Sequence, residues 1–155
     1  MNVTTYPATQ NPEPKAIVIF CFDPRFRVAF FDFIEKELGL KPWEFIPLIV
    51  AGGPAPLAHP KEMFHRCRNM IRQIMFTCNH FRTIKRVYII GHQDCGYYGI
   101  VPAATDEKSE ERERSDLPVA KDLLRLIVPE GAIVETFYAE FTDPERREIS
   151  FERIS

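Results

Sequence analysis

The sequence has no long apolar run and almost no net charge. None of its hydrophobic stretches approaches the roughly 20 residues that span a bilayer, so we expect no membrane partner. It contains 20 lysines and arginines and 22 acidic residues, which gives a formal net charge of −2. This balance argues against a nucleic-acid partner, because such proteins usually carry a basic excess. The first residues also lack the basic-then-apolar pattern of a secretion signal, which favours a cytoplasmic location.

Internal repeats and a phosphate-binding loop are absent from the sequence as well. Gly52-Gly53-Pro54 is not followed by the Lys-Ser/Thr pair of a P-loop. What is present is a chain of 155 residues, 45% hydrophobic and 27% charged, which is typical of a globular protein of one domain. Three prolines within residues 1–14 predict an extended N-terminal arm, and we expect a single folded domain over residues 15–155.

Short apolar runs alternate with helical patterns along the chain. The continuous or alternating apolar runs predict strands over 16–21, 45–50, 86–91, 132–141 and 148–154. Apolar residues spaced by three and four predict helices over 26–38, 61–81 and 117–128. This succession predicts an α/β fold. We expect a mostly parallel sheet of about five strands, in the order 2-1-3-4 plus an antiparallel edge strand, flanked by helices.

A charged segment, residues 106–116, separates the third strand from the last helix. Such runs are usually solvated, so we expect a loop or a helix edge here. Pro118 suits the first turn of a helix, which places the predicted helix start at Leu117.

Three potential metal ligands lie at the ends of two predicted strands. Cys21 closes the first strand, and His92 and Cys95 follow the third. In the order 2-1-3-4 the chain leaves these two strands in opposite directions, which opens a crevice at their carboxyl ends. Cysteine and histidine are the usual zinc ligands, and a catalytic zinc has three protein ligands and one open position. A single cysteine at a strand end or a His-x-x-Cys pair alone would be weak evidence of a metal site. Their convergence predicts Zn²⁺ bound by Cys21, His92 and Cys95.

Asp23 and Arg25 lie just beyond the first cysteine, with Pro24 between them. Arg25 can hold the Asp23 carboxylate in a bidentate ion pair, ionised and turned away from the metal. The alternative is a loop salt bridge of little energetic weight. Beside a metal centre we expect the pair to be catalytic, because neighbouring groups tune such sites.

At these residues the chain resembles the β-class carbonic anhydrases. Their Cys-x-Asp-x-Arg and His-x-x-Cys motifs match residues 21–25 and 92–95, and their Ala-Gly turn after the second strand matches Ala51-Gly52. The resemblance implies one β-carbonic-anhydrase-like zinc domain over residues 15–155. It also implies a zinc lyase that converts CO₂ reversibly to bicarbonate, with hydroxide made from a zinc-bound water, and a homodimer or larger homo-oligomer.

Ile49-Val50 stands where that family usually has Arg-Asn, and two alternatives follow. The first is a zinc enzyme acting on another small electrophile, COS or CS₂. The second is a non-catalytic zinc-binding protein in which Asp23 or another group closes the fourth position. Structural roles are expected for the remaining cysteines and histidines: Cys67, Cys78, His59, His65 and His80.

Overall fold

A computed structural model of the chain describes residues 3–100 and 109–155. Five strands form one sheet: β1 (Ala16–Phe20), β2 (Phe45–Ile49), β3 (Arg86–His92), β4 (Ile133–Phe141) and β5 (Ile149–Ile154). Their order is β2-β1-β3-β4-β5, and only the β4–β5 pair among them is antiparallel. The predicted α/β fold and strand order are therefore confirmed.

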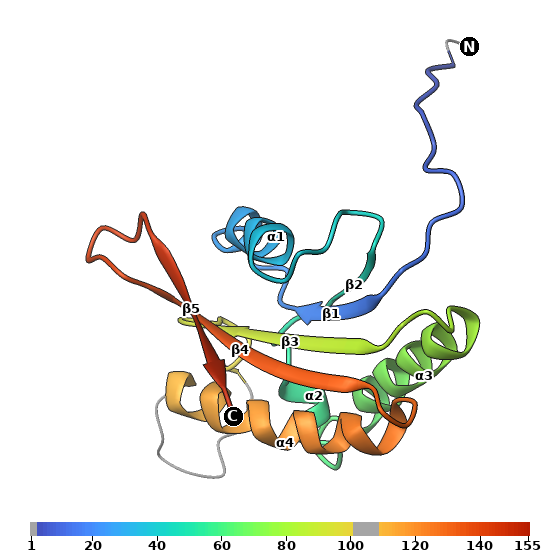
Figure 1. The fold of residues 1–155 in the computed structure, drawn as a ribbon. Coiled ribbons are helices and arrows are strands. Elements are labelled where there is room, and N and C mark those ends of the chain that lie inside the picture. Colours follow the sequence, from blue (N-terminus) through green and yellow to red (C-terminus); the bar gives the residue numbers. More distant parts are fainter. Residues whose placement is uncertain (1–2, 101–108) are drawn as a thin grey trace.

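Helices cover both faces of the sheet (Figure 1). They are α1 (Arg27–Lys36), α2 (Ala55–Ala58), α3 (Phe64–His80) and α4 (Ser109–Ile127). Ile17 and Ile19 of β1 belong to the core that α3 and α4 complete, whereas Val18 and Phe20 belong to the core around α1. Successive side chains of a strand point to opposite faces. With both faces covered, β1 is a continuous apolar run rather than an alternating one.

Helix α4 begins eight residues earlier than the sequence predicted, and Pro118 lies inside it. Residues 109–116 of the charged segment form its first turns, whereas residues 106–108 lie outside the described ranges. The expectation of a solvated segment is wrong for two side chains, because Glu113 and Asp116 are buried. They start an inward stripe with helical spacing that continues through three apolar residues, Leu117, Ala120 and Leu124.

The chain before β1 is exposed over residues 3–13 and has no helix or strand there. In Figure 1 it runs away from the body of the molecule. Across residues 3–100 and 109–155, no helix combines the length and the apolar character that crossing a membrane requires.

Replacing Leu124 by alanine is expected to lower the free energy of unfolding by about 2–5 kcal/mol, because Leu124 is fully buried between α4 and the sheet. Leu126 is the matched control, since it lies on the same helix but is 82% exposed. Leu126→Ala should change stability by no more than about 0.5 kcal/mol. Urea denaturation of both variants tests this, and equal effects would contradict the observed packing of α4.

Candidate metal centre

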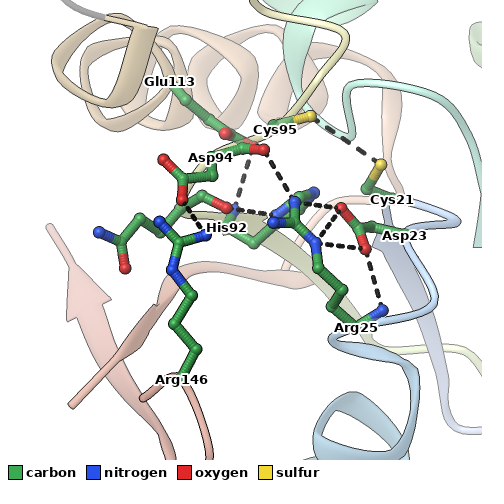
Figure 2. Close-up of polar contacts among 9 residues, drawn as sticks. Cys21, Asp23, Arg25, His92, Asp94, Cys95, Glu113 and Arg146 are labelled. Carbon is green, nitrogen blue, oxygen red and sulfur yellow. Dashed lines mark hydrogen bonds and ion pairs between the residues drawn. The ribbon is translucent and has the colours of Figure 1, made fainter. Parts of the chain in front are cut away.

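The pairing of β1 with β3 brings the three predicted ligand residues together. Cys21 immediately follows β1, His92 is the last residue of β3, and Cys95 lies in the turn after it. Because the two strands are parallel neighbours, their carboxyl ends meet at one edge of the sheet. All three side chains are buried, and their ligand atoms lie within 4.8 Å of one another. The two sulfurs are 4.0 Å apart (Figure 2).

The donor set fits a zinc ion in both spacing and chemistry. With Zn–S bonds of about 2.3 Å in a tetrahedron, two cysteine sulfurs would lie roughly 3.8 Å apart, close to the observed separation. His92 Nδ1 is 2.9 Å from the backbone carbonyl of Gln93. A carbonyl only accepts, so Nδ1 carries the proton and Nε2 presents a lone pair. Nε2 is buried and has no hydrogen-bond partner among the described residues, as expected of a metal ligand.

The four cysteines fall into two chemical classes. The hydrogen bond between the two sulfurs lowers the pKa of Cys21 and raises that of Cys95, because one thiolate is stabilised by sharing the proton of its neighbour. Burial raises the pKa of both Cys67 and Cys78, which lie apart in the core of α3. The thiolate form binds metals, and only Cys21 has a lowered pKa. Cys95 is set apart from the two core cysteines by its place in the ligand cluster, 4.0 Å from the Cys21 sulfur.

Asp23 is held by Arg25 and is not part of the ligand cluster. The Arg25 side chain donates to both carboxylate oxygens, from Nη2 at 2.7 Å and from Nε at 3.1 Å, and its backbone N–H also donates to Oδ1 at 2.9 Å. These bonds lower the pKa of Asp23 and raise that of Arg25. Arg25 Nη2 also donates to the carbonyl of Asp94 at 2.9 Å. Arg25 therefore links the segment of Cys21 to the turn that carries Cys95 (Figure 2).

A crevice of about 470 Å³ opens beside the cluster. Both cysteines and the Asp23–Arg25 pair border it, and the other lining residues are mostly apolar: Phe22, Pro24, Ala51, Gly96, Tyr97 and Ile100. His92 is fully buried behind this opening, where its ring packs on Phe26 with centroids 4.5 Å apart. Both cysteines therefore border the opening, whereas the imidazole lies away from solvent.

The Ala51-Gly52 turn forms one wall of the crevice and requires glycine. Gly52 has a φ of +76°, and a Cβ placed on it would lie 2.2 Å from the Tyr97 ring. Arg66 of α3 supports this wall, because its guanidinium lies 4.5 Å from the centre of the Tyr97 ring and donates to the carbonyl of Ala51. Ile49 and Val50 are not among the lining residues.

Two acidic residues of α4 that lie close to the site were not predicted from the sequence. The Glu113 carboxylate accepts the backbone N–H of His92 at 3.1 Å, and Asp116 accepts the Tyr98 hydroxyl at 2.7 Å. Burial raises the pKa of Glu113 well above its ordinary value. His59, expected to be structural, lies with Nε2 2.8 Å from the same Asp116 oxygen. Only the helical spacing of both acids with Leu117 could have indicated their burial.

No protein-family model matches the chain. The chain is 25% identical over 140 residues to "Putative carbonic anhydrase YvdA" of Bacillus subtilis (strain 168). The match covers 90% of this chain but 62% of that relative, so the chain spans less than two thirds of the relative's length.

Solved β-carbonic anhydrases have the same fold. Isoform I from Trichomonas vaginalis matches with a TM-score of 0.59 and 14% identity, over 97% of this chain and 87% of that one. CafA of Aspergillus fumigatus matches with a TM-score of 0.51 and 17% identity, over 93% and 76%. The chain therefore has the fold of the β-carbonic anhydrases, and its sequence is similar to that of a protein named as a putative carbonic anhydrase.

Proposed function

We propose that the protein is a zinc enzyme that interconverts CO₂ and bicarbonate. The observation that carries this proposal is the buried cluster of Cys21, His92 and Cys95, beside which Arg25 engages the Asp23 carboxylate. Three ligands from the protein leave a fourth position for water. The similarity to a protein named as a putative carbonic anhydrase supports the choice of reaction.

In this proposal each residue has a separate task. When bound, Zn²⁺ lowers the pKa of a water toward neutrality, which makes a strong nucleophile available. The two thiolates and the imidazole hold the ion. Asp23 remains an ionised hydrogen-bond acceptor next to the cluster, and Arg25 keeps it there. The largely apolar crevice suits an uncharged linear molecule such as CO₂.

The test is stopped-flow CO₂ hydration by the zinc-loaded protein across a range of pH. Arg25 lowers the pKa of Asp23, so its carboxylate is ionised at neutral and alkaline pH. A rise in activity near or above neutral pH therefore does not come from Asp23, and we assign it to ionisation of the bound water. We expect Asp23→Asn to reduce the rate without moving the midpoint of this rise. Loss of the pH-dependent rise in Asp23→Asn would contradict its assignment to water. Absence of CO₂ hydration by the zinc-loaded wild type at alkaline pH would contradict the proposed function.

COS or CS₂ hydrolysis is the second candidate. The observation that favours it is the apolar lining of the crevice, since these molecules are linear electrophiles that the same nucleophile would attack. Hydrolysis assays on the same zinc-loaded samples decide between the substrates. Closure of the fourth position by Asp23, one form of the non-catalytic alternative, is disfavoured because Arg25 engages both oxygens of that carboxylate.

A homodimer or larger homo-oligomer is part of the proposal. Large apolar side chains are exposed on and near α1 and the edge strand β2: Phe22, Val28, Phe31, Trp43 and Ile49. Exposed apolar surface of this kind often marks a protein interface. Light scattering is expected to give at least twice the monomer mass of 18.0 kDa. A monomer mass throughout the micromolar range would contradict this expectation.

We further propose a cytoplasmic location and a single zinc domain over residues 15–155 preceded by an arm. All four cysteines are free thiols, which suits a reducing compartment. The hydrophobic cores on the two faces of the sheet both include residues of β1. Together they contain residues from Ala16 to Ile154, which supports one domain.

A further inference from the structure

We propose that Glu113 and Asp116 of α4 are positioning residues that hold the turn carrying His92 and Cys95 in its metal-binding shape. This inference rests on the proposed metal centre and extends it to a helix that supplies no ligand. The two acids lie one helical turn apart. Each contacts one side of the turn, at His92 and at Tyr98. Cys95 lies midway between these two anchored residues.

Glu113 accepts a backbone donor that the sheet leaves unpaired. Strand β1 ends at Phe20, opposite Ile90, two residues before His92. The next N–H, of Gln93, donates to the carbonyl of Ala139 in β4. Successive N–H groups of a strand point to opposite sides, so the N–H of His92 points to the side where β1 has ended. The Glu113 carboxylate occupies that place and satisfies it.

The neighbouring glycine makes room for this contact. A Cβ placed on Gly91 would lie 3.0 Å from Glu113 Oε1, so Gly91 lets the carboxylate reach the backbone. Burying a carboxyl group is costly unless it is hydrogen-bonded. An apolar residue in place of Glu113 would continue the buried stripe of Leu117 and Leu124, but it would leave the His92 N–H without its acceptor.

Asp116 anchors the far side of the turn. Tyr98 is 1% exposed, and its hydroxyl donates to Asp116 Oδ2 at 2.7 Å. The side chain of His59, next to α2, contacts the same oxygen at 2.8 Å. The Tyr98 backbone N–H donates in turn to the carbonyl of Cys95 at 3.0 Å. A shift of Asp116 would therefore reach the Cys95 ligand through Tyr98.

Metal affinity of the full-length protein tests the inference separately from catalysis. Co²⁺ is bound in place of zinc, and its dissociation constant is measured by chelator competition while thiolate-to-Co²⁺ absorption is followed. Glu113→Leu and Asp116→Leu should each weaken binding about 10–100-fold, the usual effect of losing a group that supports a ligand. Glu113→Gln and Asp116→Asn keep an acceptor oxygen and should bind nearly as the wild type does.

Leu124→Ala is the matched control, because it destabilises the same helix without touching the turn; its dissociation constant should equal that of the wild type. If Glu113→Leu does not fold, Gly91→Ala replaces it, since the added methyl displaces the carboxylate and should also weaken binding. Folded leucine variants with wild-type affinity would overturn the inference, as would a Gln variant as weak as the Leu variant.

The outcomes for the wild type separate this inference from the proposed function. A wild type that binds Co²⁺ through thiolates but does not hydrate CO₂ refutes the proposed activity and leaves the positioning role supported by the affinities. A wild type without thiolate-to-Co²⁺ absorption refutes the metal centre and both proposals with it.

Discussion

Replacing Cys21 and Cys95 together by serine is expected to give a folded protein that retains no zinc. Two of the three candidate ligands are then lost, and serine does not provide a thiolate at neutral pH. The loss of affinity should exceed the roughly 10–100-fold that substitutions of supporting residues cost. Elemental analysis of protein purified without added metal measures this directly, with about one zinc per chain expected for the wild type.

The matched control replaces the two core cysteines, Cys67 and Cys78, by serine. These residues are buried as well, but they lie outside the ligand cluster. We expect this pair of changes to lower stability and to leave zinc content at its wild-type level. An unchanged zinc content in the Cys21/Cys95 variant would refute the ligand assignment. Labelling by thiol reagents adds a second readout, because Cys21 and Cys95 should react only after chelation.

Asp23→Ala is expected to lower CO₂ hydration about a hundredfold or more while zinc content stays near one per chain, because an acceptor beside the reacting water is lost. Arg25→Ala should produce a comparable loss for a different reason. It frees the Asp23 carboxylate from the side-chain hydrogen bonds that now hold it, so that Asp23 can compete with water for the metal. Stopped-flow rates and zinc content measured on the same samples test both variants.

Two further variants show whether the Asp23–Arg25 geometry matters. Arg25→Lys keeps the charge but loses the planar fork that contacts both carboxylate oxygens, so its activity should fall well below that of the wild type. Arg146→Ala removes another arginine near the ligand turn, which pairs with Asp94 at 2.7 Å but is about half exposed. The exposed Arg146–Asp94 ion pair should contribute little to the stability of the site. If the Asp23 and Arg25 variants are as active as Arg146→Ala, the pair is only a loop salt bridge.

The sheet order was predictable because burial on both faces is apparent in the sequence. β1 and most of β3 are apolar without alternation, and the structure covers both of their faces. Pro47 lies within β2, which is one of the two edge strands of the sheet. An edge strand tolerates a residue that lacks an N–H group. The convergence of Cys21 with His92 and Cys95 then follows from topology.

The supporting residues could not be predicted, because their roles depend on tertiary contacts. Acidic residues in a charged run are normally solvated, and the apolar part of the α4 stripe begins only at Leu117. Apart from its helical spacing with Leu117, nothing in the sequence distinguishes Glu113 from its exposed neighbour Glu111. The difference arises when α4 packs against the end of β3, where the His92 N–H requires an acceptor. Propensity and periodicity do not contain this information.

The separation of the ligands along the chain has a consequence for folding kinetics. Cys21 and Cys95 are 74 residues apart in sequence, and they meet only where β1 pairs with β3. Closing so long a loop in a parallel sheet is a slow, non-local step. A complete ligand set therefore does not exist in any partly folded chain that lacks this pairing. Metal capture by all three ligands marks the moment at which the centre of the sheet is assembled.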